Sequence, residues 1–400
     1  MVKWVLIISL IVMIVLRVCL IYSDRGKLAV GISVKIIETI NNNLQREKGR
    51  NYIDSGDIWI KLPTVTNLEG GDRIMVVGRL SSKVIIKNKN KFLLIPRHIE
   101  IQKHSNSYPV LLRERLLSWI PGDEGALAVG LLFGGTGYMG RTTTEYFRRA
   151  GISHILSASG YNVSLVASWI TTVCVILVGK KRGLGFSIIG IWIYVWLAGP
   201  TPAVIRAAVM ATATIVGLLE GRETDVGWWL VLTALLMLIY NPLWISDIGF
   251  LLSFASMAGL IWIQPLLKIS RLPRYLLGVW EMLSVTLTAQ LVTMPLILYF
   301  FGDISVIAPV SNLAILWLVP LVMQVLGATM LVGVFVPALG QILAYLAWPE
   351  LHYMVGITKV LGSLEIASWS LGKISWVWMA GAYATIILGV IYIKTKQKLA

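Results

Sequence analysis

Charged side chains are scarce in this 400-residue chain, and so are groupings of residues that bind metals. Only 14% of the residues are charged, against about a quarter in soluble domains, while 56% are hydrophobic. The composition excludes an ordinary soluble enzyme and predicts an integral membrane protein. The two cysteines, Cys19 and Cys174, lie inside apolar runs, which favours buried thiols over a disulfide. The four histidines have no cluster of cysteines or carboxylates around them, so neither a metal site nor another cofactor is expected.

The chain also lacks a glycine-rich loop of the G-x-x-x-x-G-K type, so any energy source would be an ion gradient or a separate protein. Positive charge, by contrast, is in excess, with a formal net charge of +15. Two interpretations are open. Cytoplasmic loops of membrane proteins are rich in Lys and Arg, and a polyanionic partner would be attracted by the same charge.

Hydropathy divides the chain into four segments. Residues 1–23 predict an uncleaved N-terminal transmembrane anchor, because a good cleavage site is missing. Residues 24–105 are polar and strand-like, residues 106–150 form an amphipathic and re-entrant transition, and residues 151–400 predict a polytopic membrane domain. The predicted fold class is a polytopic α-helical membrane protein with about ten membrane segments and an inserted small extracellular OB-like β-barrel.

Within residues 24–105, short apolar runs separated by turn residues predict a small β domain. The expected strands are 27–37, 57–62, 73–80, 83–86, 92–95 and 99–101. Basic residues concentrate near the end of this segment, and the candidates for DNA binding are Arg79, Lys83, Lys87, Lys89, Lys91, Arg97 and Lys103. On an oligonucleotide-binding barrel they would track phosphates, whereas the alternative is a solvated lysine-rich hairpin.

The expected spans of the membrane domain are 155–178, 185–199, 202–219, 227–240, 248–264, 279–301, 306–325, 327–346 and 376–393. The positive-inside rule places the basic loops near residues 180, 222, 271 and 394 in the cytoplasm. Both termini are then cytoplasmic and the β domain is outside, although Arg148 and Arg149 also fall outside, against the rule. Residues 124–133 are apolar but too short to span, which indicates a re-entrant segment, and residues 341–371 predict an amphipathic helix.

A polar cluster opens the first long span of the membrane domain. His154, Ser157, Ser159 and Asn162 are spaced so that they would share one helical stripe, and Gly160 would allow close backbone approach. Polar groups at the start of a span are expected to face a bundle interior or a water-filled path. They could bind phosphates or bases, or they could hold neighbouring helices together, and the pattern supports both roles.

Three further polar residues interrupt apolar spans. Arg206 follows a proline-rich helix break, and an arginine within a membrane span needs a partner or water. It would attract phosphates in a conduit for DNA, or it would form a structural pair with Asp247, Glu281 or a carbonyl group. Asp247 is itself expected to cap the following helix. Gln290 and Asn312 are candidates for lining a path, or for interhelical hydrogen bonds.

One polar segment and four membrane segments form a series along the chain. They are 68–80 (LEGGDRIMVVGRL), 147–166 (FRRAGISHILSASGYNVSLV), 200–211 (PTPAVIRAAVMA), 241–260 (NPLWISDIGFLLSFASMAGL) and 289–322 (AQLVTMPLILYFFGDISVIAPVSNLAILWLVPLV). Together and in this order they resemble the ComEC-type competence family, the channel proteins of natural transformation. Two departures stand out. Asn162 stands where the family usually has a second histidine, and the metal-binding run of the metallo-β-lactamase-like domain that many members carry does not occur.

The resemblance implies a channel that passes single-stranded DNA across the cytoplasmic membrane during natural transformation and catalyses no covalent step. It implies single-stranded DNA and the lipid bilayer as partners, together with an extracellular DNA receptor, a cytoplasmic DNA-translocating ATPase and a separate nuclease. It leaves a homo-oligomer open. The polar cluster, Arg206, Gln290 and Asn312 would then line the DNA path.

Two other functions stay open. A secondary transporter of a small anionic solute would use Arg206 as its anion site and would work without the β domain. A non-conducting envelope scaffold derived from the same family would tolerate substitution of Arg206.

Overall fold

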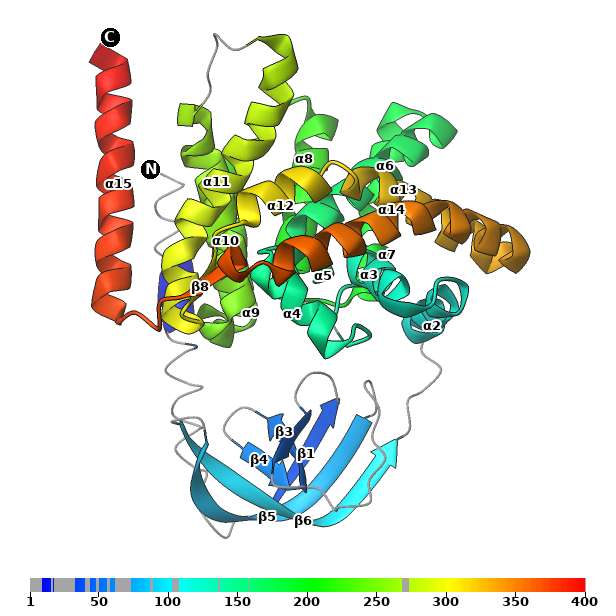
Figure 1. Ribbon diagram of the computed structural model, residues 1–400, viewed down its shortest axis with the longest axis vertical. Coiled ribbons are helices and arrows are strands. Elements are labelled where there is room, and N and C mark those ends of the chain that lie inside the picture. Colours follow the sequence, from blue (N-terminus) through cyan, green and yellow to red (C-terminus); the bar gives the residue numbers. More distant parts are fainter. Residues whose placement is uncertain are drawn as a thin grey trace. The chain divides into compact units, whose positions relative to one another are not determined.

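A computed structural model describes residues 9–15, 17, 33–39, 44–47, 50–55, 58–61, 73–86, 89–102, 108–135, 137–157, 159–267 and 273–399. The chain divides into two compact units, one within Leu16–Leu111 and the other made of Met1–Val15 and Leu112–Ala400. The first unit is built mainly of strands and the second mainly of helices (Figure 1).

The β unit is a six-stranded sheet in the order β1-β5-β6-β4-β3-β2. Its strands are β1 (Ser33–Thr39), β2 (Leu44–Glu47), β3 (Arg50–Ser55), β4 (Ile58–Lys61), β5 (Arg73–Ile86) and β6 (Lys89–Gln102). The β4–β6 pair is parallel and the others are antiparallel. Ile60, Val76 and Leu94 are fully buried, so a core lies against β4, β5 and β6. Among the described strands, β1 and β2 stand at the two edges and no pairing joins them.

The two long strands of this unit differ from the sequence prediction. Residues 73–80 and 83–86 were expected as separate strands, yet both lie in β5, and residues 92–95 and 99–101 both lie in β6. The β5–β6 register shifts between Val77 and Gly78 and between Leu80 and Ser82. A β-bulge interrupts the alternation of side chains without ending the strand, so the broken pattern gave the appearance of a turn.

Besides the helical residues 9–15, the helical unit contains the α-helices α2 to α15. They are α2 (Tyr108–Trp119), α3 (Gly122–Phe133), α4 (Arg141–Arg149), α5 (Ser153–Leu156), α6 (Gly160–Val178), α7 (Lys180–Ala198), α8 (Pro202–Glu220), α9 (Val226–Tyr240), α10 (Ile248–Trp262), α11 (Arg274–Phe300), α12 (Ala308–Ile315), α13 (Val319–Phe335), α14 (Pro337–Ser363) and α15 (Trp376–Leu399). Short 3-10 turns follow α9, α10 and α14 at Pro242–Ser246, Gln264–Leu267 and Glu365–Ala367, and the strands β7 (Asp303–Ser305) and β8 (Ser368–Ser370) pair as a small sheet.

Four helices are long and apolar enough to cross a membrane, and they lie at Gly160–Val178, Pro202–Glu220, Leu276–Phe300 and Trp376–Lys396. A fifth span results if α12 and α13, which are bent by 49°, are taken as one. The described residues therefore support a polytopic membrane protein but not ten spans. The predicted span 327–346 is wrong, because α13 ends at Phe335 and α14 begins with Pro337, whose missing N–H and fixed φ favour a new helix start.

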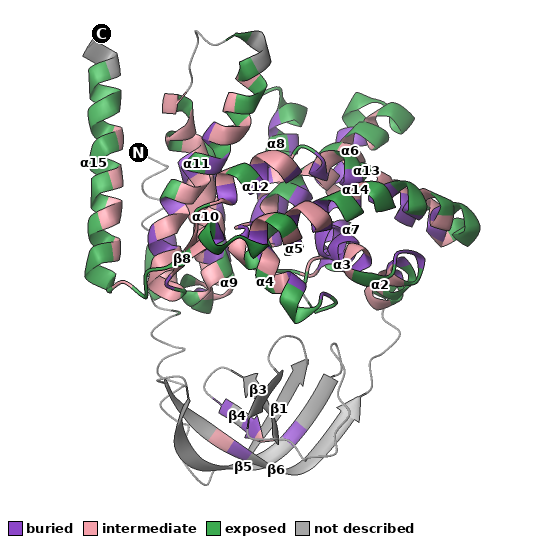
Figure 2. Ribbon diagram, viewed as in Figure 1, coloured by how far each residue is buried: buried purple, intermediate pink, exposed green. Residues whose placement is uncertain are grey.

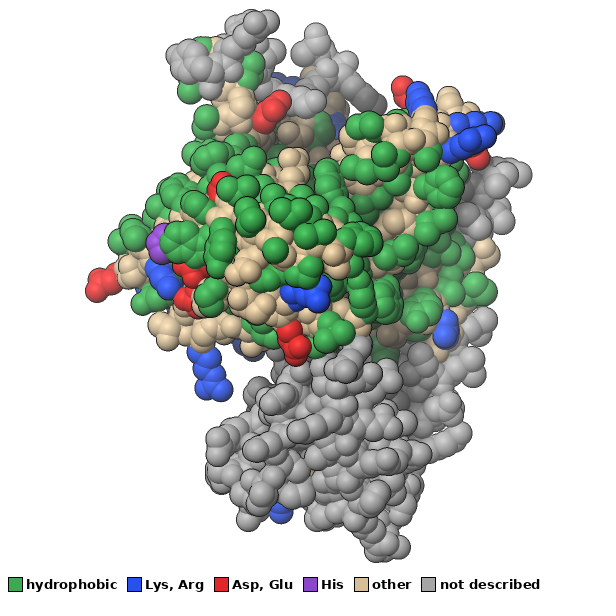
Figure 3. All heavy atoms as spheres, turned by 90° about the vertical axis from the view of Figure 1, so that its right-hand side faces the viewer, with side chains coloured by type: hydrophobic (Ala, Val, Ile, Leu, Met, Phe, Trp, Pro, Cys, Tyr) green, Lys and Arg blue, Asp and Glu red, His purple; other side chains and the backbone are tan. Residues whose placement is uncertain are grey.

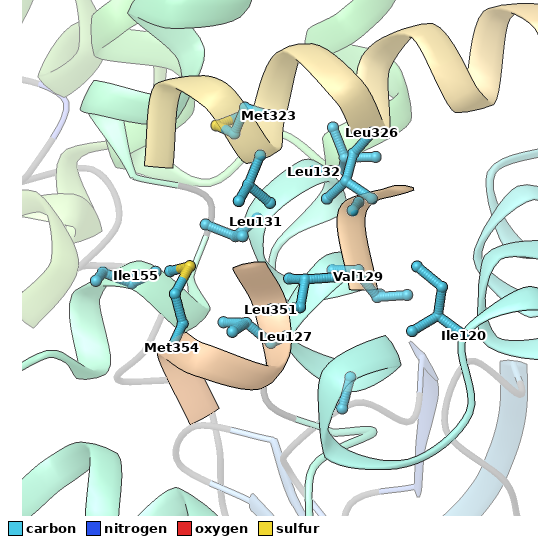
Figure 4. Packing of buried hydrophobic residues seen from close by; sticks show 14 of the residues in the cluster. Ile120, Leu127, Val129, Leu131, Leu132, Ile155, Met323, Leu326, Leu351 and Met354 are labelled. Atoms are coloured by element: carbon cyan, nitrogen blue, oxygen red, sulfur yellow. The ribbon is translucent and has the colours of Figure 1, made fainter. Parts of the chain in front are cut away.

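Helix α3 lies at the centre of the largest hydrophobic core. Its residues from Gly125 to Phe133 are all buried, whereas α15 is exposed along most of its length (Figure 2). Figure 4 shows Leu127, Val129 and Leu131 of α3 packed near side chains of α13 and α14, including Met323 and Leu351. A twelve-residue helix is about 18 Å long, too short to cross a bilayer, yet it is surrounded by protein. The length agrees with the expectation that residues 124–133 do not span the bilayer, and their re-entrant character stays a prediction.

An ion pair and a contact with a histidine hold the N-terminal end of α3 against α14. Asp123 Oδ2 lies 2.8 Å from Lys359 Nζ and accepts a hydrogen bond from Thr143 Oγ1 of α4 at 2.7 Å. Glu124 Oε1 lies 2.8 Å from His352 Nδ1. The first turn of α3 thus presents acidic groups where the helix dipole favours them, and basic groups of a neighbouring helix meet them.

Arginines on the amphipathic helices α2 and α4 bond to carbonyl groups at the C-terminal ends of other helices. Arg113 donates to the Leu197 carbonyl of α7 at 3.3 Å, and Arg115 donates to the Gly333 carbonyl of α13 at 3.3 Å. Arg149 donates to the carbonyl of Leu364, the residue that ends α14, at 2.6 Å. The last carbonyls of a helix have no intrahelical partner, and cations there also oppose the negative end of the dipole. The contact of Arg149 gives a structural role to one of the two arginines that the predicted orientation places outside, against the positive-inside rule.

Hydrophobic side chains cover most of the helical surface that Figure 3 displays, and charged side chains lie mostly toward its margins. Phe335 is 83% exposed and Trp378 is 75% exposed. Large apolar side chains at this exposure are costly in water but match a hydrocarbon solvent, which identifies the helical unit as membrane-embedded.

Candidate functional site

The predicted polar stripe from His154 to Asn162 is broken in the structure. Helix α5 ends at Leu156, Ser157 has extended backbone angles, and α6 begins at Gly160 with Ser159 as its N-cap. His154 and Ser157 are exposed, and Ser157 Oγ donates to the His154 carbonyl at 3.2 Å. The expectation of a single helical stripe is therefore wrong, because serine at position 159 competes for the backbone N–H groups and starts a new helix.

The first turn of α6 positions Asn162 deep inside the protein. Ser159 Oγ accepts a hydrogen bond from the Asn162 backbone N–H at 3.2 Å and donates to Asn162 Oδ1 at 3.0 Å. Asn162 Nδ2 donates to the Leu131 carbonyl of α3 at 3.1 Å, and the residue is only 1% exposed. Both ends of its amide are in use within the protein, which favours the helix-joining role among the two that the sequence left open.

Tyr194 of α7 completes this contact, although no sequence pattern singled it out. Its hydroxyl donates to the Leu132 carbonyl at 2.8 Å, next to the carbonyl that Asn162 caps. Two side chains from two helices, α6 and α7, therefore satisfy two of the last carbonyls of the buried helix α3. A buried carbonyl without a hydrogen-bond partner is costly, so these two bonds stabilise the C-terminal end of α3.

Arg206 is buried in α8 with neutral partners. Its Nε donates to Ser253 Oγ of α10 at 2.8 Å, its Nη1 lies 3.7 Å from Met210 Sδ, and its guanidinium lies 5.9 Å from the ring centre of Phe254. The residue is 7% exposed. Among the ion pairs found between described residues, none includes Arg206, so the structural pair with Asp247 or Glu281 is not present there. Asp247 instead caps α10 as predicted, accepting from the Phe250 N–H at 2.8 Å.

The guanidinium of Arg206 also meets the N-terminal end of α6. A Cβ atom at Gly160 would collide with Arg206 Nη2, so only glycine leaves room for this approach. The N-terminal end of a helix carries a positive partial charge. A buried cation and a helix N-terminus therefore face each other without a carboxylate between them in the described part of the chain, and this arrangement is suited to an anion.

Gln290 and Asn312 lie elsewhere in the helical unit. Gln290 of α11 donates through Nε2 to the Ser305 carbonyl of β7 at 3.0 Å. Its Oε1 and the Oδ1 of Asn312 in α12 are buried without a hydrogen-bond partner among the described residues. No hydrogen bond links either residue to Arg206 in the described chain. Gly160 therefore lies against Arg206, whereas Ser159 bonds Asn162, which in turn bonds α3. Gln290 bonds β7 instead.

The basic candidates of the β unit fall partly within its long strands. Arg79 and Lys83 lie on β5, and Lys89, Lys91 and Arg97 lie on β6. The register pairs Arg79 with Ile95 and Lys91 with Val84. Lys87 and Lys103 lie outside the described residues. These positions follow one two-stranded ribbon of the sheet.

Comparison with known proteins assigns the membrane part of the chain. The Competence protein family profile matches residues 131–396, more than half of the chain. The chain is 26% identical to ComE operon protein 3 of Bacillus subtilis (strain 168) over 212 residues, which cover 52% of this chain and 27% of that protein. It is 27% identical to Competence protein ComA of Neisseria gonorrhoeae over 237 residues, which cover 56% of this chain and 33% of that protein. The matched regions thus span about a third or less of these relatives. No solved structure matches the chain significantly. The extent of the profile match shows that this chain belongs to the Competence protein family.

Proposed function

We propose that this chain passes single-stranded DNA across the cytoplasmic membrane during natural transformation. Family membership and the names of the two relatives support a role in competence. The observation that carries the proposal is Arg206, a buried cation whose described partners are neutral and which faces the N-terminal end of α6.

The physical argument concerns the cost of that charge. A buried cation without a counter-ion is expensive, and a membrane surround adds to the cost. The cost is recovered when an anion enters, because the guanidinium and the first N–H groups of α6 both favour negative charge. A DNA phosphate supplies that charge once per nucleotide. The guanidinium would therefore bind each phosphate of the passing strand briefly and then bind the phosphate of the following nucleotide.

The β unit is the proposed capture surface for the strand. We propose that residues 24–105 form an extracellular OB-like domain between an anchor at 1–23 and the transition at 106–150, followed by the membrane domain at 151–400. Arg79, Lys83, Lys87, Lys89, Lys91, Arg97 and Lys103 would then bind phosphates outside the membrane. Positions along one ribbon of adjacent strands suit a polyanion that runs in one direction.

The orientation and the partners follow from this proposal. Both termini are cytoplasmic, an extracellular receptor delivers DNA, and a cytoplasmic ATPase pulls the strand. A separate nuclease removes the other strand, and the chain itself forms or breaks no covalent bond.

DNA uptake in cells that carry only variant copies of this chain tests the proposal. The variants are Arg206→Met, which removes the charge, Arg206→Lys, which keeps the charge but loses the planar fork, and Arg222→Gln as an exposed arginine control just beyond α8. The readouts are chain level in the membrane, labelled DNA at the cell surface, and nuclease-protected DNA inside the cell. We expect Arg206→Met to keep surface DNA and to lose most internal DNA, Arg206→Lys to be intermediate, and Arg222→Gln to match the wild type.

The same experiment separates the two other functions. A scaffold would give normal internal DNA with Arg206→Met at normal chain level. A strain in which the gene is deleted is added to the set, and a small-anion transporter would give normal DNA entry there. Either result overturns the proposal.

A further inference from the structure

Helix α15 borders a groove that the protein itself leaves open. Figure 1 shows α15 standing beside the other helices, and its Tyr383 hydroxyl donates to the Val292 carbonyl of α11 at 2.9 Å. A cavity of about 620 Å³ lies between α10, α11 and α15. In a bilayer such a space between apolar spans is filled by hydrocarbon rather than by water.

The groove is apolar along its walls and charged at one position. Its walls include Phe254 and Ala258 of α10, Leu296 of α11, and Ile387 and Val390 of α15. Among the described residues that line the groove, Lys394 is the single charged one. An apolar slot with one cation does not suit a water-soluble anion, which would gain nothing from the walls.

The lysine and an aromatic ring lie toward the same end of the groove. Helices α10 and α15 both run antiparallel to α11, so their C-terminal ends point the same way. Trp262 is the last residue of α10, and Lys394 and Lys396 lie near the end of α15. A tryptophan beside lysines at the end of an apolar helix is typical of the membrane–water interface, where a lysine extends its ammonium group toward the head groups.

The geometry points to a binding site for an anionic phospholipid, with one acyl chain in the groove and the phosphate at the Lys394 ammonium. Basic groups between membrane helices bind anionic lipid head groups, and the attraction of one lysine corresponds to about a fivefold preference. A zwitterionic lipid would fill the groove equally well but would lack the net negative charge. The site does not depend on what the chain transports.

Retention of lipids by the purified protein, counted by native mass spectrometry, tests this site. Phosphatidylglycerol and phosphatidylcholine with identical acyl chains are offered in equal amounts. We expect about a fivefold preference for phosphatidylglycerol in the wild type and in the control Lys373→Gln, which removes a lysine just before α15 begins. Lys394→Gln should bring the two lipids close to equal retention. Ala258→Phe, which fills the groove, should lower the number of retained lipids by one.

Three results would overturn the site. They are equal retention of both lipids by the wild type, the same preference in Lys394→Gln as in Lys373→Gln, and displacement of the lipid by soluble glycerol phosphate alone. The lysine variants lie at exposed positions, so their folding is expected to match the wild type.

Discussion

Replacement of Asn162 by alanine should destabilise the contact that ends the buried helix α3. The Asn162 amide donates to the Leu131 carbonyl at 3.1 Å and accepts from Ser159 Oγ at 3.0 Å. Alanine leaves that carbonyl without a partner in a site where the residue itself is 1% exposed. A buried unpaired group costs about 1–3 kcal/mol, although interhelical hydrogen bonds in membranes average about 0.6 kcal/mol. We favour the higher range because a carbonyl in the last turn of α3 has no intrahelical partner.

The assay is thermal unfolding of the purified protein in detergent. For a chain of 400 residues, about 1–3 kcal/mol corresponds to a lowering of the melting temperature by roughly 1–4 °C. Asn162→Asp should be worse than alanine, because a carboxylate would face the Leu131 carbonyl. Tyr194→Phe removes one hydrogen bond and should cost about 1 kcal/mol. Hydrogen exchange of residues 130–135 should rise in all three variants.

The matched control is Ser164→Ala, on the same helix. Ser164 is exposed and its hydroxyl bonds the Gly160 carbonyl within α6, so its loss should leave the melting temperature nearly unchanged. If Asn162→Ala and Asn162→Asp unfold at the same temperature as Ser164→Ala, the amide does not hold α3 and the reasoning fails.

Three further predictions concern other contacts. Gly160→Ala should displace the buried guanidinium of α8 and lower DNA entry at normal chain level, while Gly185→Ala, in open space on α7, should have no effect on entry. Arg149→Met removes the hydrogen bond to the Leu364 carbonyl at the end of α14 and should lower the free energy of unfolding by about 0.5–2 kcal/mol. A lowered melting temperature would show this loss. The hydrogen bond from Arg148, opposed by desolvation, holds the pKa of Glu145 below its ordinary value. Its stabilising effect is therefore present above the ordinary pKa and is lost as the pH falls through the lowered pKa, so acidification should destabilise Glu145→Gln less than the wild type. Equal acid sensitivity of the two proteins would contradict this assignment.

Helix positions were largely predictable because apolar runs and capping residues are local signals. The predicted span 202–219 agrees with α8, and 227–240 agrees with α9. Asp247 acts as a cap, as its spacing before an apolar run indicated. Apolar character alone does not show where one helix stops, so the predicted span 327–346 ran across the end of α13 at Phe335, and the break between α5 and α6 was missed.

The contacts of the site were not predictable in the same way. The Arg206 partners come from α10 and α6, and the α3 caps come from α6 and α7. Such pairings depend on how helices pack, and hydropathy carries no information on which helix faces which. The polar types at Ser159 and Asn162 were visible in the sequence, but their use as a cap and a bridge was not. Tyr194 had no signal, because a tyrosine in an apolar span looks like any other aromatic residue.

Photo-crosslinking beside Arg206 tests the central claim most directly. A photoreactive amino acid at Met210, whose Sδ lies 3.7 Å from Arg206 Nη1, is compared with the same group at Leu388, which is exposed on α15. Illumination during uptake of end-labelled DNA should attach the single strand at position 210 only, and Arg206→Met should abolish the adduct. Normal DNA entry with no adduct at position 210, or with equal adducts at both positions, would contradict a DNA path beside Arg206.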